Sequence, residues 1–448
     1  MIAYMKAFKF ILPLSLIIGL GSCDSFLDVQ PRSSISDAQT IVDKASAETA
    51  INGVYDSFRS YYSVDFQSIG YLSGDNIQWT GSQSQIQEFI NHRVNAENST
   101  VASVWSGIYS SLNRINHVIE KVPAVQDALL TDALKNKIVG EAHFLRALAY
   151  FDLARIWGGV PIVTKPTGSP SDNRGIERAT QEQVYAQVLA DLNTAEPLLP
   201  ATTDRFRATQ KTVWALKARY YLYQKDYAKA EEYATKIIAD AASYQLVKPY
   251  NAFFANDARG TTESVFEIFY SVNETNGHRG QWQPQEKGGT RQWAPNDAFV
   301  ALVNNPEIGG NRSTLVAKDN QGRWYGNMYY RSPATDPTFV IRIAELYLIR
   351  AEARANTNNL TGALADLNAI RERAGIAKST AATSEQLLLA IENERRVEFA
   401  LEPHRWFDLV RTGRAAAVLS VTDANRLVLP IPAEQLLIDK ALKQNPGY

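Results

Sequence analysis

The stretch IRIAELYLIRAEARANTNNLTGALADLNAIR, residues 341–371, decides the fold of this chain. Its apolar residues recur at intervals of three and four on both sides of the polar segment NTNN, which predicts two antiparallel helices joined by a turn. Ala351 and Ala363 are the small residues of this pair, and they allow the two helix backbones to approach closely. The larger side chains expected to fill the seam are Tyr347, Leu367 and Ile370.

A second stretch, TVWALKARYYLYQKDYAKAEEYATKIIAD at residues 212–240, repeats this spacing. Its matching positions are Trp214, Ala218, Ala230, Ala234 and Ile237. An aromatic residue, small residues and apolar residues in this order follow the 34-residue tetratricopeptide pattern. Because such hairpins bury one face against a neighbouring helix pair, the sequence predicts a mainly α fold. We expect a tetratricopeptide-like helical-repeat scaffold with long inserted loops and a few short β-strands.

Charge and composition exclude one class of function. The 448 residues include 46 basic and 47 acidic side chains, so the formal net charge is only −1. Without a basic surface or a long run of like charges, the chain lacks the electrostatic footprint that nucleic-acid binding needs. We therefore predict no nucleic-acid partner. The aromatic content is high, with 21 Tyr, 17 Phe and 8 Trp, and rings in irregular segments are candidates for ligand contacts.

The first 22 residues have the pattern of a cleaved secretion signal. Lys6 and Lys9 precede an apolar run over residues 10–20 that ends in small residues. As a helix, this run of about 11 residues would be roughly 16 Å long, which is too short for a bilayer core of ~30 Å. We predict that residues 1–22 are a signal peptide and not a membrane span.

The tetrapeptide Leu-Gly-Ser-Cys at residues 20–23 resembles a bacterial lipobox. Cys23 is the only cysteine in the sequence, so a disulfide within the chain is excluded and modification of the thiol is the better interpretation. We predict that Cys23 becomes the lipidated first residue of the mature protein. The polar residues 23–36 would then form a short tether.

Residues 37–448 are expected to form a single domain in which helical and irregular parts alternate. The expected helical framework covers residues 37–60, 101–241 and 338–448. Two regions, residues 60–100 and 242–337, lose the helical period and are predicted to be loop-rich regions that carry the ligand site. Within them only SVFEIFYS, residues 264–271, is β-prone enough for a strand.

Local signals predict where some helices begin and end. Ser36 or Asp37 is expected to cap the first helix, and Thr180 with Gln183 resembles a capping box. Gly158, in the segment WGGVP, is expected to end the long helix before it.

Several ordered motifs carry a resemblance to a known family. They are CDSFLDVQP at 23–31, FLRALAYFDLARIWGGVPIV at 144–163, RIAELYLIRAEA at 342–353, ERRVEFALEPHRWFDLVRTG at 394–413, LPIP at 429–432 and QNPGY at 444–448. With these motifs the chain resembles the SusD/RagB family of surface lipoproteins of Bacteroidetes bacteria over nearly its whole length.

The resemblance implies a tetratricopeptide-like framework, a lipid anchor in the outer membrane and a body at the cell surface. It also implies capture of oligosaccharides, or of peptides in some relatives, for a SusC-like TonB-dependent outer-membrane transporter. The family resemblance assigns no ligand-contacting residue, because its relatives vary most in their loops.

The sequence shows no signature of catalysis or metal binding. Its five histidines are isolated, no H-E-x-x-H spacing occurs and no G-x-S-x-G elbow is present. Glu394 and Glu398 lie one helical turn apart, so we interpret the charges around them as ion pairs along a helix. We predict no metal, no cofactor and no enzymatic activity. A carboxylate pair for glycoside hydrolysis stays open here, because only a separation of ~5–10 Å in space is required.

A sugar-binding site needs a flat ring against the C–H face of the sugar and polar groups around its hydroxyl rim. Covering roughly 100 Å² of that face contributes about 2.5 kcal/mol. In the first loop-rich region we predict Trp79 as such a platform, with Asp75 and Asn76 as rim contacts. The candidates from the second region are Trp282, Trp293, Trp324, Tyr325 and Arg331. The competing interpretation is that a loop tryptophan pins its loop to the scaffold.

The leading hypothesis is thus a receptor that binds oligosaccharide nutrients and delivers them to a transporter. An oligopeptide receptor of the same architecture is the first alternative. The second is a repeat scaffold that grips only proteins in surface complexes.

Overall fold

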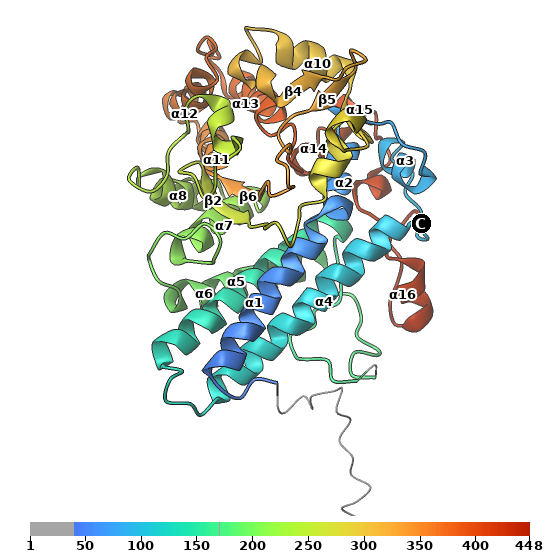
Figure 1. Ribbon diagram of the computed structural model, residues 1–448, viewed down its shortest axis with the longest axis vertical. Helices are drawn as coiled ribbons and strands as arrows, with labels where there is room; N and C mark the ends of the chain where they lie inside the picture. Colours follow the sequence, from blue (N-terminus) through green and yellow to red (C-terminus); the bar gives the residue numbers. More distant parts are fainter. Residues whose placement is uncertain (1–39, 170) are drawn as a thin grey trace, which may run out of the picture. The chain divides into compact units, whose positions relative to one another are not determined.

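Two helical hairpins with the expected spacing pack together in the computed structural model, which describes residues 40–169 and 171–448 (Figure 1). The first hairpin is α7 (Gln210–Tyr223) with α8 (Tyr227–Ile238), and the second is α11 (Ile343–Asn356) with α12 (Leu360–Arg373). α11 contacts α7, α8 and α12. The seam alanines Ala230, Ala234, Ala351 and Ala363 are fully buried. The prediction of a mainly α, tetratricopeptide-like fold is confirmed.

Four longer helices precede the first hairpin and run alongside one another in Figure 1. They are α1 (Lys44–Tyr61), α4 (Ser99–Lys121), α5 (Asp132–Trp157) and α6 (Gln181–Leu198). α5 is buried on nearly all sides from Phe144 onward and ends at Gly158, whose φ of 73° favours glycine. The predicted capping box of Thr180 and Gln183 is present at the start of α6.

The predicted start of the first helix is wrong. α1 begins at Lys44, and its N-cap is Asp43 instead of Ser36 or Asp37. The Asp43 carboxylate accepts a hydrogen bond of 2.8 Å from the Ser46 amide, and the Ser46 hydroxyl accepts one of 3.0 Å from the Asp43 amide. This reciprocal pair satisfies two free N–H groups and fixes the helix start.

The two loop-rich regions contain more regular structure than expected. The first holds α2 (Val64–Leu72), β1 (Ile77–Trp79) and α3 (Ser84–Ile90). The second holds β2 (Ser264–Ile268), α9 (His278–Trp282), β3 (Trp293–Pro295), α10 (Asp297–Asn304), β4 (Val316–Lys318) and β5 (Trp324–Gly326). Every residue of α2 from Phe66 to Leu72 is buried, so the helix lacks the one-sided apolar period by which sequence analysis finds helices. The predicted strand within 264–271 is confirmed over β2.

The described strands pair in three antiparallel two-stranded sheets. β2 pairs with β6 (Thr338–Arg342), β4 with β5, and β1 with β3. In the β1–β3 pair Trp79 lies opposite Trp293. This pair therefore joins the two loop-rich regions, which are far apart in the sequence.

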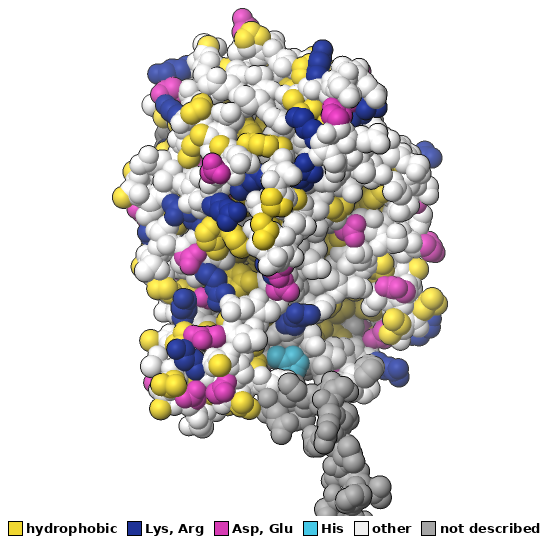
Figure 2. All heavy atoms as spheres, in the orientation of Figure 1, with side chains coloured by type: hydrophobic (Ala, Val, Ile, Leu, Met, Phe, Trp, Pro, Cys, Tyr) yellow, Lys and Arg dark blue, Asp and Glu magenta, His cyan; other side chains and the backbone are white. Residues whose placement is uncertain are grey.

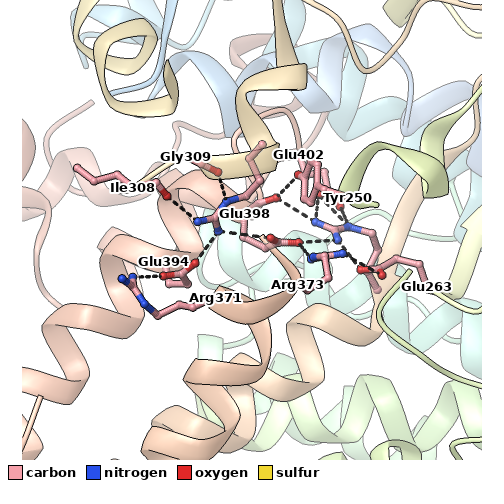
Figure 3. A network of polar contacts seen from close by, with 11 residues as sticks. Tyr250, Glu263, Ile308, Gly309, Arg371, Arg373, Glu394, Glu398 and Glu402 are labelled. Atoms are coloured by element: carbon pink, nitrogen blue, oxygen red, sulfur yellow. Dashed lines mark hydrogen bonds and ion pairs between the residues drawn. The ribbon is translucent and has the colours of Figure 1, made fainter. Parts of the chain in front are cut away.

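The last described helices are α13 (Ser384–Glu398), α14 (Arg405–Arg411), α15 (Ala415–Leu419) and α16 (Ala433–Ile438). A network of fully buried charges connects α13 to its neighbours (Figure 3). Arg342 contacts Glu263 at 2.8 Å, Glu398 at 2.9 Å and Glu402 at 2.6 Å. Arg373 pairs with the same Glu263 and Glu398. Charges from β6, α12 and α13 are thus neutralised inside the fold.

Arg312 extends the network by contacting Glu394 at 2.6 Å, and Arg371 contacts the other oxygen of Glu394 at 2.9 Å. Glu394 and Glu398 therefore each form ion pairs with arginines, as their spacing in the sequence predicted. Their partners Arg312, Arg342, Arg371 and Arg373 come from three other segments and not from the same helix, so the ion pairs lie inside the protein.

Residues 41–448 form one compact unit. On the face that Figure 2 shows, basic and acidic side chains are interspersed, in agreement with the balanced composition. No helix among the described residues is both long enough and apolar enough to cross a membrane. The predicted signal peptide, the lipidation site Cys23 and the tether at 23–36 lie outside the described residues.

Candidate functional site

The β1–β3 pair forms one wall of a pocket of about 360 Å³, here called the β1–β3 pocket. The other walls come from α2, α3 and the N-terminal end of α4, which lie together in Figure 1. The uncharged polar lining consists of Gln83, Gln85, Gln281, Gln292, Ser68, Ser99, Thr100 and Ser103. The remaining lining residues are Trp79, Trp293, Val64, Ile86 and Asp65.

The pocket contains polar atoms that the protein does not satisfy. The indole nitrogens of Trp79 and Trp293 and the side-chain oxygen of Gln281 are buried without a hydrogen-bond partner. A buried polar group left without a partner costs about 1–3 kcal/mol. These three atoms are themselves shielded from solvent, so the polar groups that a ligand would meet are the other amides and hydroxyls of the lining.

Trp79 is half-buried and is held from behind by the chain itself. A Cβ atom placed on Gly81 would lie 2.3 Å from Cζ2 of Trp79, so only glycine fits beside the indole. The amide of Thr80, between them, donates to the carbonyl of Gln292 at 2.8 Å. Trp79 is therefore a ring in a fixed position at the edge of the pocket, as a sugar platform requires.

Trp324 is also half-buried, but it lies outside the pocket lining. The Lys318 ammonium lies 4.9 Å from its ring centre. Its carbonyl accepts a hydrogen bond of 2.8 Å from Nε of Arg291, the residue before Gln292. Trp324 thus contacts Arg291, and the next residue, Gln292, contacts the loop that follows Trp79. Trp324 remains a proposed ligand contact at the margin of the pocket.

Four of the predicted ligand residues do not face solvent, and the expectation that they do is wrong. Trp282 and Trp293 are 0% exposed, Tyr325 is 1% and Arg331 is 2%. The rings of Trp282, Trp293 and Tyr71 pack edge-to-face with centroids 5.3–5.5 Å apart. Of the four, only Trp293 lines the pocket. These rings pin the second loop-rich region to α2, which is the competing interpretation of loop tryptophans.

Tyr325 and Arg331 are occupied by partners within the protein. The Tyr325 hydroxyl accepts a hydrogen bond of 2.5 Å from the Lys287 ammonium. Arg331 donates to the carbonyl of Ala255 at 2.8 Å and lies 3.6 Å from Asp336. Both side chains therefore hold loops together.

Asp75 and Asn76 do not line the β1–β3 pocket, and their role as rim contacts beside Trp79 stays a prediction. The Asp75 carboxylate accepts a hydrogen bond of 2.7 Å from Nε of Arg405 and lies 3.2 Å from Arg396. The Asn76 oxygen accepts one of 2.8 Å from Nε of Arg396. Both residues therefore tie the turn before β1 to α13 and α14.

The polar lining of the pocket was not predicted from the sequence. The loop-rich regions are rich in amide side chains throughout, so nothing singled out the four glutamines Gln83, Gln85, Gln281 and Gln292. The run QSQIQ, which begins at Gln83, four residues after Trp79, was the available signal. The pairing of β1 with β3, which brings Gln292 to this run, had no local signal.

Behind the pocket, His278 packs against Trp293 and is 0% exposed. Burial lowers its pKa to about 3 from an ordinary value of 6.5. Folded His278 therefore stays neutral, while the unfolded chain takes up a proton as the pH falls below 6.5. Lowering the pH thus favours unfolding, by up to about 1.4 kcal/mol per pH unit for this histidine.

We expect His278→Phe to flatten the decline of stability between about pH 6.5 and 4, where only the unfolded state gains the proton. Urea unfolding followed by tryptophan fluorescence at a series of pH values measures this slope. His404, whose pKa burial also lowers to about 3, maintains part of the decline in the variant. An unchanged slope in His278→Phe would contradict the assignment.

No group of three or more His, Cys, Asp or Glu side chains suited to hold a metal ion occurs in the described part of the chain. The pocket itself contains one carboxylate, Asp65, and no second carboxylate among its described lining residues. Its chemistry is that of hydrogen bonding and ring stacking.

Comparison with known proteins defines the class to which this architecture belongs. Residues 25–222 match a family model described as starch-binding and associating with the outer membrane, and residues 217–420 match the model of the SusD family. The two matches together span most of the chain. The chain belongs to the SusD/RagB family.

Individual relatives agree with this assignment. SusD-like protein P38 of Formosa agariphila is 28% identical over 99% of this chain and 100% of its own length. The starch-binding protein SusD of Bacteroides thetaiotaomicron is 25% identical, covering 71% of this chain and 74% of that protein. A solved laminarin-binding SusD-like protein is 26% identical with a TM-score of 0.80, covering 91% of this chain and 100% of that one.

Proposed function

We propose that this protein is a cell-surface lipoprotein that binds oligosaccharide nutrients in the β1–β3 pocket and delivers them to a TonB-dependent outer-membrane transporter. The observation that carries the proposal is the pocket itself, where an indole in a fixed position lies among glutamine amides that have no partner within the described chain. Relatives named for binding starch and laminarin support the ligand class.

The pocket offers both kinds of contact that a sugar requires. Trp79 supplies the apolar platform, and the side-chain amides of Gln83, Gln85, Gln281 and Gln292 form no hydrogen bond within the described chain. Each amide both donates and accepts, as a sugar hydroxyl does. With one platform worth about 2.5 kcal/mol and several amide contacts, we expect millimolar to ten-micromolar affinity, which allows release of the ligand.

We also propose that the protein is a binder and not an enzyme. The pocket has one carboxylate, Asp65, which accepts a hydrogen bond of 2.7 Å from the Ser103 hydroxyl. Glycoside hydrolysis generally requires two carboxyl groups flanking the scissile bond. Incubation with the bound oligosaccharide should return it uncleaved.

Binding assays test the ligand class directly. We expect the mature protein to be retained by immobilised glucans and not by a library of unmodified peptides. An oligopeptide receptor would give the opposite result, and a pure protein scaffold would retain neither ligand. If the protein delivers its ligand to a transporter, we expect an affinity-tagged form to purify from outer membranes together with a TonB-dependent porin.

Membrane attachment is proposed to depend on Cys23. We expect Cys23→Ala to release the protein from the membrane fraction, because acyl chains contribute ~0.8 kcal/mol per buried methylene and nothing in the described chain replaces them. Membrane fractionation with an antibody against the protein measures the release. Ser22→Thr, which keeps the thiol, is the matched control, and retention of Cys23→Ala in the membrane would contradict lipid anchoring.

A further inference from the structure

The charges around the β1–β3 pocket limit which glycans fit it. Asp65 is the sole charged side chain among its described lining residues, and none of them is Lys or Arg. A sulfate or uronate group needs a cation or several N–H donors to replace its water shell. This pocket offers amide N–H donors but no cation, so the charge of such a group would face the Asp65 carboxylate without compensation.

The nearest basic residue in the sequence, Arg291, is directed elsewhere. Its Nε donates to the carbonyl of Trp324 at 2.8 Å, and Arg291 does not line the pocket although Gln292 does. The carboxylate of Asp65 is half-buried and has only the Ser103 hydroxyl as a partner. Its negative charge is therefore not neutralised by an ion pair.

The amide lining of the pocket matches uncharged hydroxyl groups. The side chains of Gln83, Gln85, Gln281 and Gln292 line the pocket, and each carries an amide that both donates and accepts. A hydroxyl can satisfy both the N–H groups and the oxygen of an amide, because it donates one hydrogen bond and accepts others. A sulfate or an ionised carboxylate only accepts, so it would leave the oxygens of the lining amides without a donor.

We infer that the pocket selects neutral oligosaccharides and rejects sulfated and uronic-acid glycans. This inference rests on the proposed function and adds the substrate class to it. The selection acts through the exclusion of basic side chains from the lining and through the unpaired charge of Asp65. Both features belong to the residues of this chain and are open to single substitutions.

The test compares each neutral glucan with its own sulfated derivative. Laminarin and amylopectin, native and chemically sulfated, are titrated into the mature protein by isothermal calorimetry at fixed ionic strength. We expect the sulfated form to bind at least about tenfold more weakly than the native form, because like charges repel strongly in a partly desolvated site. Raising the salt concentration should narrow the difference by screening.

Two variants change the selectivity by different means. Asp65→Asn removes the repelling charge while keeping a partner for Ser103, and Gln85→Lys adds a cation to the lining. Each is expected to reduce the preference for the neutral glucan several-fold. Gln224→Lys, at an exposed position outside the pocket, adds the same charge and should leave the preference unchanged.

The possible results distinguish the inferred selectivity for neutral glycans from the proposed oligosaccharide binding itself. Equal or tighter binding of the sulfated glucan by the unmodified protein would overturn the inference and leave oligosaccharide binding intact. A preference that Gln224→Lys alters as much as Gln85→Lys would also overturn it, because net charge and not the pocket would then decide. Retention of peptides with no binding of either glucan form would overturn the proposed function as well.

Discussion

Replacing Arg342 by methionine is expected to lower the free energy of unfolding by about 3–5 kcal/mol, the usual cost of removing one partner from a buried ion pair. Arg342 is fully buried and gives Glu402 its guanidinium partner, with contacts of 2.6 and 3.0 Å. Glu263 and Glu398 keep Arg373, but Glu402 would be left as a buried charge without compensation. Urea unfolding monitored by circular dichroism measures the loss.

Two further variants test whether the loss arises from the unpaired carboxylate. Arg342→Met combined with Glu402→Gln should recover part of the stability, since the stranded charge is removed. Lys248→Met breaks a pair whose side chains are 60% and 65% exposed, and we expect a change within about 0.5 kcal/mol. A similar loss in Lys248→Met and Arg342→Met would contradict the importance of the buried network.

The second large effect concerns the ligand. We expect Trp79→Ala to weaken oligosaccharide binding about 30- to 100-fold, because it removes a platform worth about 2.5 kcal/mol. Trp79→Phe keeps a flat ring and should retain most of the affinity. Titration calorimetry with the same glucan measures both variants, and the unfolding curve of each variant shows whether the fold is intact.

Trp214→Ala is the matched control for Trp79→Ala. Trp214 is also half-buried, but it lies on α7, where its indole nitrogen donates to Glu196 at 2.7 Å. Its replacement should change stability and not affinity. If Trp79→Ala bound the glucan as tightly as the unmodified protein, the β1–β3 pocket would not be the oligosaccharide site.

The helical framework was predictable because its signals are local. Ala351 and Ala363 lie within one hairpin, and the capping box of Thr180 and Gln183 lies within one helical turn. Such spacing follows from the geometry of a single helix pair. The helix α2 escaped prediction because every residue from Phe66 to Leu72 is buried, so its sequence lacks a one-sided apolar period.

The candidate site was predictable only in part. A tryptophan in an irregular segment is equally suited to hold a ligand or to pin its loop, and the sequence does not distinguish Trp79 from Trp282. What separates them is burial, which depends on partners such as Tyr71 and Gly326 that lie elsewhere in the chain. The partners of Asp75, on α13 and α14, are likewise distant in the sequence and had no local signal.

The pairing of Trp79 with Trp293 also couples ligand binding to the integrity of the entire unit. The two strands of this wall are 214 positions apart in the sequence (293 − 79), so the wall does not form without the chain that joins them. A sugar bound in the pocket stabilises the native state through mass action alone. Saturating glucan should therefore raise the melting temperature of the intact protein, and an amino-terminal fragment that stops before β3 should have no affinity at all.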